Sequence, residues 1–146
     1  MSAVLGLDTN VLVRYFVVPG EDAAERHQCA LARTLVDGGR PLRVCKTVLL
    51  ELEWVLRGYY RYPRADIARA LAWLAAQTHV ELEDRGAVEQ ALANYAEGFD
   101  FADALHHASY ADCQHVASFD DRGFARRADR MKLQPPVRVP GATRRR

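Results

Sequence analysis

An α/β fold is predicted for this chain, in the form of a three-layer α/β/α sandwich with a central parallel sheet. The order of segments along the chain predicts it. Short apolar segments alternate along the chain with longer segments of helical periodicity. Helices therefore connect successive strands, and such connections are typical of parallel βαβ units.

The expected strands are short and apolar. They cover residues 3–7, 42–45, 79–82, 115–119 and 137–139. The expected helices follow helical spacing and carry residues that start or stop a helix, such as Gly38, Pro63, Asp84 and Gly98. They cover residues 21–39, 48–60, 64–77, 85–98, 101–113 and 121–132.

The length of 146 residues, with 49% hydrophobic residues, suits one domain with one core. We expect this domain to cover residues 1–140 and residues 141–146 to form a basic, disordered tail. No apolar run approaches the ~20 residues that span a bilayer, and no signal peptide is evident, so we expect a cytoplasmic protein without membrane contact. Three scattered cysteines argue against a disulfide framework or a zinc site.

Charge is unevenly distributed along the chain. The formal net charge is +1, but residues 1–121 carry eleven basic and eighteen acidic side chains, whereas residues 122–146 carry nine basic and one acidic. This asymmetry indicates either a polyanionic or acidic partner near the C-terminus, or a solvated helix face followed by a loose tail.

Asp8 interrupts the apolar run "VLGLDTNVLVRYF" at the end of the first expected strand. Asp8 or Asn10 would cap a following helix, or the triplet would form a turn. Alternatively, Asp8 holds a ligand, because ligands of open α/β sheets bind beyond the carboxyl ends of the strands.

Three further acids stand at strand ends or near helix starts, namely Glu51, Asp103 and Asp120. Carboxylates gathered at one sheet edge repel one another unless a cation neutralises them. Oxygen ligands without convincing cysteine partners suit Mg²⁺ or Mn²⁺, and such an ion promotes hydrolysis of a phosphodiester.

Each acid also has a purely structural explanation. One of Glu51 and Glu53 should face the interior and the other the solvent, because residues two apart point in different directions on a helix. Asp100 or Asp103 would stabilise the start of one helix, and Asp120 or Asp121 would cap another. These alternatives stay open at this stage.

The segments "LDTNVLVRYF", "VLLELEWVLRGYY", "DFADALHHA" and "SFDDRGFARRA" together resemble those of PIN-domain proteins, and specifically of VapC-type toxin ribonucleases. The resemblance implies an Mg²⁺- or Mn²⁺-dependent endoribonuclease that is the toxin of a toxin–antitoxin pair. It implies catalytic roles for Asp8, Glu51, Asp103 and Asp120, the three aspartates being metal ligands. It implies supporting roles for Asn10 and Ser118, and we rank Asp100 and Asp121 behind them.

We expect Arg14, Arg122 and Arg126 to guide the RNA by phosphate contacts, with Arg127 as a further candidate. Tyr15 or Phe119 would stack on a base, although core packing is favoured for both. Segment 48–74 is interpreted as a helical hairpin over the sheet, as a groove for an antitoxin helix, or as a dimer surface. The resemblance implies a homodimer and a cognate antitoxin protein.

Two other functions compete. The stretch "LGLDTNVLV" partly resembles the first motif of haloacid-dehalogenase-type phosphatases, but Asn10 stands where that chemistry needs a second aspartate. A nucleic-acid-binding module of the same fold without turnover is the other, and the presence of all four acids disfavours it.

Overall fold

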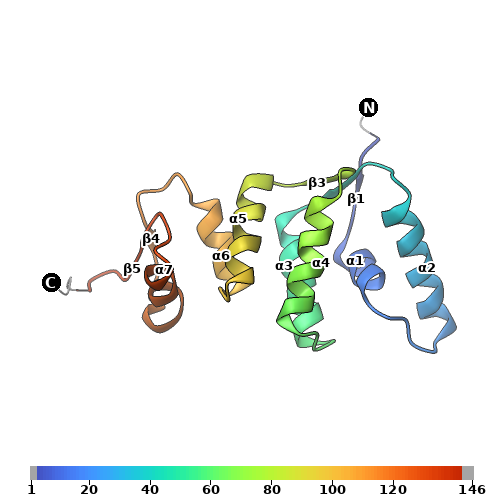
Figure 1. Cartoon of the computed structure of the whole chain (residues 1–146), viewed down its shortest axis with the longest axis horizontal. Helices are drawn as coiled ribbons and strands as arrows, with labels where there is room; N and C mark the ends of the chain where they lie inside the picture. Colours follow the sequence, from blue (N-terminus) through green and yellow to red (C-terminus); the bar gives the residue numbers. More distant parts are fainter. Residues whose placement is uncertain (1–2, 143–146) are drawn as a thin grey trace. The chain divides into compact units, whose positions relative to one another are not determined.

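The computed structural model describes residues 3–142. The chain divides into two compact units, and the boundary along the sequence falls between Val88 and Glu89, within helix α5 (Arg85–Ala96). Figure 1 labels most elements of both units. The expected tail falls almost wholly outside the description, because residues 143–146 are not among the described ones.

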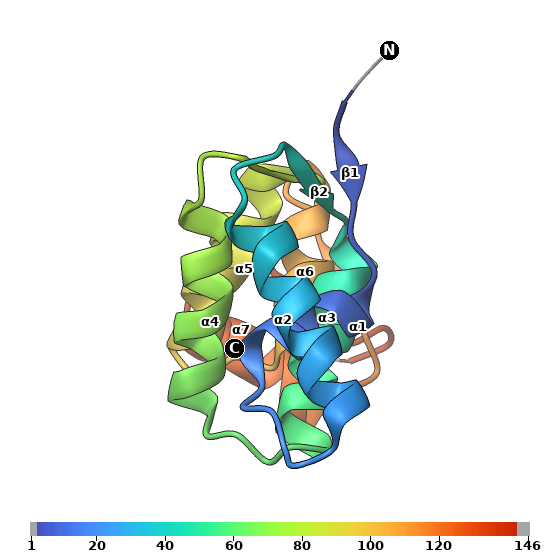
Figure 2. The same cartoon turned by 90° about the vertical axis from the view of Figure 1, so that its right-hand side faces the viewer.

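The first unit is built on a three-stranded parallel sheet in the order β1-β2-β3. Strand β1 (Leu5–Gly6) pairs with β2 (Leu42–Val44), which pairs with β3 (Val80–Leu82). Figure 2 shows β1 and β2 running in the same direction. The carboxyl ends of all three strands therefore lie at one edge of this sheet.

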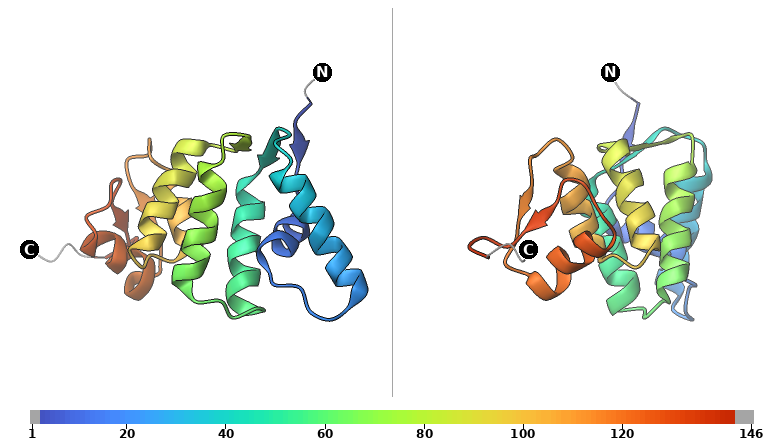
Figure 3. Two further views of the ribbon diagram at one scale, coloured as in Figure 1. Left: turned by 45° about the vertical axis from the view of Figure 1, so that its right-hand side comes forward. Right: turned by 60° about the vertical axis from the view of Figure 1, so that its left-hand side comes forward.

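Four helices accompany this sheet. They are α1 (Thr9–Phe16), α2 (Ala23–Asp37), α3 (Lys46–Gly58) and α4 (Arg64–Ala76). Helix α1 packs on α2 and α3, and α3 packs on α4. The last two are joined by loop 59–63 and run antiparallel (Figure 3). Fully buried leucines and valines at sheet and helix positions, such as Leu42, Val44, Leu52 and Leu56, form the core.

The second unit contains α6 (Phe101–Ser109), the π-helical turn η1 (Asp121–Ala125) and α7 (Arg126–Arg130). Strand β4 (Val116–Ala117) pairs in parallel with β5 (Val137–Arg138). Its core is aromatic: the ring centroids of Tyr95 and Phe101 lie 5.2 Å apart, and those of Phe99 and Phe124 5.8 Å apart. Buried His107 places its Nε2 2.8 Å from the carbonyl of Pro135.

The α/β class with a parallel sheet flanked by helices is confirmed. Helix α1 was expected only through the alternative that Asp8 or Asn10 caps a following helix, and no range was predicted for it, because its residues include several β-branched ones. Burial of Thr9, Leu12 and Val13 stabilises it instead, since these residues share one helical face. The segment expected as a strand over 115–119 keeps only two strand residues, and Phe119 within it is exposed.

Candidate functional site

Asp8 directly follows the carboxyl end of β1 and is the N-cap of α1. Its Oδ1 accepts a hydrogen bond from the backbone N–H of Thr9 at 2.8 Å. Of the two capping candidates the structure selects Asp8, since Asn10 lies within α1 and is exposed. The cap leaves Oδ2 of Asp8 available at the sheet edge where ligands of α/β folds bind.

Glu51 and Glu53 of α3 divide as the helical spacing predicts. Glu53 is only 3% exposed, and its two carboxylate oxygens accept bonds from Nε of Arg57 at 2.9 and 3.2 Å. Glu51 is exposed, and no hydrogen bond or ion pair reaches its carboxylate from elsewhere in residues 3–142. Glu53 is thus a structural acid, whereas Glu51 is free to bind a ligand.

Asp100 and Asp103 take different roles at the start of α6. Asp100 is the N-cap, and its Oδ1 accepts from the backbone N–H of Asp103 at 3.0 Å. Burial, and then the negative charges of Asp100 and Asp120, raise the pKa of the Asp103 carboxyl above its ordinary value. His106 and Arg127 act against this rise. Within the described residues the Asp103 carboxylate has no hydrogen bond or ion pair, so it would gain from a cation.

Asp120 is held by the turn that follows it. Its Oδ1 accepts from the N–H of Gly123 at 2.9 Å and its Oδ2 from the N–H of Phe124 at 3.2 Å. The hydroxyl of Ser118 accepts from the backbone N–H of Asp120 at 3.1 Å. The cap is therefore Asp120, whereas Asp121 is exposed in the first position of η1.

Gly123 is a supporting residue that the sequence analysis missed. A Cβ at this position would lie 2.5 Å from Oδ2 and 2.8 Å from Oδ1 of Asp120. Only glycine therefore admits the carboxylate in its capping position. The sequence could have indicated this residue by its position, because the backbone N–H of the residue three positions after an N-cap acid donates to the capping carboxylate.

In the second unit, Asp100 and Asp120 both lie within electrostatic reach of Asp103. Asp8 and Glu51 belong to the first unit, where Asp8 and the start of α3 follow neighbouring parallel strands. Within residues 3–142 no group of three His, Cys, Asp or Glu side chains converges tightly enough to hold a metal ion. Assembly of all four acids around one ion remains a prediction.

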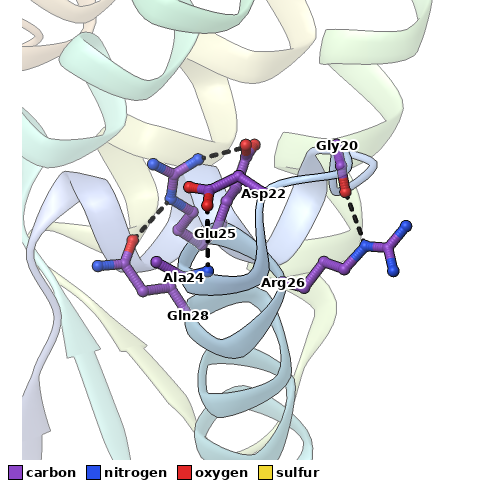
Figure 4. A network of polar contacts seen from close by, with 7 residues as sticks. Gly20, Asp22, Ala24, Glu25, Arg26 and Gln28 are labelled. Carbon is purple, nitrogen blue, oxygen red and sulfur yellow. Dashed lines mark hydrogen bonds and ion pairs between the residues drawn. The ribbon is translucent and has the colours of Figure 1, made fainter.

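The three arginines predicted to guide RNA differ in availability. The guanidinium of Arg14 already donates to Gln28 and Glu25, each at 3.1 Å, which ties α1 to α2. Figure 4 shows this network, in which Asp22 also caps α2. A phosphate would have to compete with Glu25 for Arg14, whereas Arg122 and Arg126 are exposed.

The two aromatic residues considered for base stacking, Tyr15 and Phe119, differ in their surroundings. Tyr15 stacks on Trp73, with ring centroids 5.3 Å apart, and donates from its hydroxyl to Asp37 at 2.6 Å. Phe119 is 82% exposed immediately before Asp120. Core packing was the favoured expectation for both; it is wrong for Phe119, whose ring remains available to a base.

A cavity of about 390 Å³ lies between α1 and α2. Its walls are mainly apolar and also include polar side chains of the Arg14 network. The lining residues are Asn10, Val11, Arg14, Gln28, Leu31, Ala32 and Leu35.

None of the helices within residues 3–142 combines the length and hydrophobicity that crossing a bilayer requires. Among protein-family models, the one described as PIN domain matches residues 6–130, which is most of the chain. Searches of curated proteins and of solved structures returned no match.

Proposed function

The chain belongs to the PIN domain family, whose members are typically metal-dependent nucleases, and from this premise we propose that it is an Mg²⁺-dependent endoribonuclease. The observation that carries the proposal is the half-buried Asp103 carboxylate, whose pKa burial and the charges of Asp100 and Asp120 raise although His106 and Arg127 act against the rise. Carboxylates that repel one another are costly unless a cation binds near them.

The donor set fits a hard cation, because every proposed ligand is a carboxylate oxygen. Asp8, Asp103 and Asp120 would hold the ion, and Glu51 would assist directly or through water. A bound Mg²⁺ would neutralise the carboxylates and act as a Lewis acid toward a phosphoryl oxygen. Mn²⁺ would serve in the same way.

The residues of the chain supply the positioning. The N–H groups of Gly123 and Phe124 fix the Asp120 carboxylate, and Thr9 fixes Asp8. Arg122 and Arg126 carry exposed positive charge close to Asp120 in sequence, where phosphates of the RNA would bind. The exposed ring of Phe119 would stack on a base.

The proposed toxin role is supported by the resemblance of the four motifs. A toxin of this kind would act on RNA in the cytoplasm. A cognate antitoxin would dock an apolar segment into the cavity between α1 and α2, whose walls include Val11, Leu31 and Leu35. We further propose that the chain forms a homodimer.

The experiment incubates the purified chain with total RNA and Mg²⁺, maps the cut sites, and repeats this with EDTA. Asp8→Asn and Asp103→Asn should abolish cleavage, while Asp112→Asn, a matched exposed carboxylate outside the proposed site, should cleave normally. Full activity of Asp8→Asn would disprove the assignment. Hydrolysis of a small phosphomonoester would favour the phosphatase alternative, and RNA binding without turnover would favour the silent binding module.

A further inference from the structure

His107 of α6 is a buried polar side chain that the proposed reaction does not use. It is only 3% exposed. Its Nε2 lies 2.8 Å from the carbonyl oxygen of Pro135, which follows 28 residues later in the chain. A carbonyl oxygen only accepts, so the proton is assigned to Nε2, which donates this bond. Because burial of an imidazole costs free energy unless its N–H is bonded, the bond to Pro135 determines how the ring lies.

The ring of His107 also packs against the turn that holds Asp120. The ring centroids of His107 and Phe124 lie 6.4 Å apart, with the ring planes at 87°. Phe124 is buried in η1, and its backbone N–H donates to Oδ2 of Asp120 at 3.2 Å. Because protein interiors are close-packed, loss of the His107 ring shifts Phe124 and with it a donor to the Asp120 carboxylate.

The bond to Pro135 leads to Asp120 by a second route. Pro135 lies two residues before β5, and β5 pairs with β4. The carbonyl of Arg138 in β5 accepts from the N–H of Ser118 at 3.0 Å, and the Ser118 hydroxyl accepts from the N–H of Asp120 at 3.1 Å. His107 therefore contacts both segments that fix Asp120, namely the turn after it and the strand pair before it.

The helix that carries His107 also carries Asp103. Asp103 stands one turn before His107, so the two side chains point to the same side of α6. The negative charge of Asp120 acts on the Asp103 carboxyl, so the two acids lie near each other. The contacts of His107 thus join the helix with one acid to the turn with the other. Groups that act together at a site have to be held to within ~0.5 Å of their working geometry.

We infer that His107 is a positioning residue of the proposed nuclease site, which sets the place of the Asp120 carboxylate relative to that of Asp103. The inference rests on the proposed ribonuclease function. It adds a residue that acts through Phe124 and Pro135 and not on the ion or the RNA. Groups behind a metal site orient its ligands, and their loss typically lowers metal affinity or activity ~10- to 100-fold. A displacement of ~1 Å slows a reaction by a similar factor.

Two substitutions separate the hydrogen bond from the space that the ring fills. His107→Leu fills much of this space but has no donor for the carbonyl of Pro135. His107→Gln keeps an N–H donor on a side chain of similar reach. The matched control is His79→Leu in the first unit, because Nε2 of His79 lies 2.7 Å from the carbonyl of Val36 at the amino end of β3, away from the acids. If His107→Leu does not fold, His107→Phe, which keeps a ring but has no donor, replaces it.

Metal binding is measured by calorimetric titration of each full chain with Mn²⁺ alone. His107→Leu should raise the Kd for Mn²⁺ about tenfold, and His107→Gln should restore it to within about threefold of the wild type. His79→Leu should leave this Kd unchanged. Cleavage of an RNA that the wild type cuts should follow the same order, with a lower kcat and an unchanged KM, because His107 acts on the ligands of the ion and not on RNA binding.

Amide hydrogen exchange in EDTA tests the positioning without an ion. The reference is the N–H of Ala104, which donates to the carbonyl of Asp100 at 2.8 Å at the start of α6. Relative to this amide, those of Gly123 and Phe124 should exchange about tenfold faster in His107→Leu than in the wild type. If exchange at Ala104 rises by the same factor, the whole unit opens more often, His107 is only structural, and the inference is wrong.

The outcomes distinguish this inference from the proposed function. Unchanged Mn²⁺ affinity and kcat in His107→Leu, beside a wild type that cleaves RNA, would overturn the inference and leave the ribonuclease standing. Equal losses in His107→Leu and His107→Gln would also overturn it, because the donor would then not matter. If the wild type cleaves no RNA, but exchange at Gly123 and Phe124 rises selectively in His107→Leu and recovers in His107→Gln, the positioning of Asp120 is supported and the nuclease is refuted.

Discussion

Removing the cap at Asp120 should separate its structural role from its role as a ligand. The Asp120 carboxylate accepts two backbone N–H bonds, from Gly123 and Phe124, and Asp120→Ala removes both. Loss of an N-cap typically costs ~1 kcal/mol and at most ~2. Because two donors lose a charged acceptor, we expect a loss of about 1.5 kcal/mol in the free energy of unfolding.

For a chain of this length, 1 kcal/mol corresponds to about 2–4 °C in Tm, so Asp120→Ala should unfold about 4 °C below the wild type. Asp120→Asn keeps a capping oxygen, and Asn is as good an N-cap as Asp, so its Tm should fall by no more than about 2 °C. Both variants should lose cleavage. Far-UV circular dichroism in EDTA gives the Tm values without any contribution from a bound ion.

Gly123→Ala tests the same reasoning without touching a carboxylate. The new Cβ would lie 2.5 Å from Oδ2 of Asp120, so the carboxylate must leave its capping position. The variant should therefore lose about 1.5 kcal/mol, as Asp120→Ala does, and should cleave RNA much more slowly. If Gly123→Ala were as stable and as active as the wild type, the argument that this glycine seats the carboxylate would be wrong.

Three further outcomes are expected. The folded state raises the pKa of Asp103, so ionisation of its carboxyl destabilises the fold. In EDTA, Asp103→Asn should therefore become more stable relative to the wild type as the pH rises above 3.8. A stability difference that does not change with pH would contradict this expectation. Arg57→Met leaves the carboxylate of Glu53 buried without its partner. Urea unfolding should show a loss of about 2 kcal/mol in the free energy of unfolding. The double variant Arg57→Met, Glu53→Leu should recover this loss, because it removes the buried charge. Burial and the bond to Asp37 raise the pKa of Tyr15 to about 12. Tyr15→Phe should therefore remove one late-titrating tyrosine from the ultraviolet titration, and the stability of the wild type should fall between pH 10 and 12.

The alternation of apolar and helical segments was sufficient to predict the α/β class, because strand pairing here follows from short apolar runs joined by helices. Helix α4 (Arg64–Ala76) begins directly after Pro63, as its sequence indicates. Helix α1 could not be predicted in the same way. Its residues have low intrinsic helix propensity, and packing against α2 and α3, which no local pattern reveals, decides its conformation.

The site could be predicted in residue type but not in the role of each acid. The spacing predicts that Glu51 and Glu53 face different directions, but it does not predict which of them is buried. Glu53 is the buried one, and it pairs with Arg57 one helical turn later. The close approach of Gly123 to Asp120 depends on a π-helical turn, which has no sequence signature of its own.

Capping and ligand binding, which the sequence presents as alternatives for Asp8 and Asp120, are compatible in this structure. A capping carboxylate accepts hydrogen bonds from backbone N–H groups at the start of a helix, and these bonds fix its direction. Asp8 uses only Oδ1 for this purpose, and each carboxylate oxygen offers two lone pairs, so both acids retain acceptor capacity at the ends of β1 and β4. Asp103 is the exception, because Asp100 caps its helix, and burial together with the charges of Asp100 and Asp120 raises the pKa of the Asp103 carboxyl. A divalent ion would therefore stabilise Asp103 most, and the Tm gained on adding Mg²⁺ should disappear in Asp103→Asn.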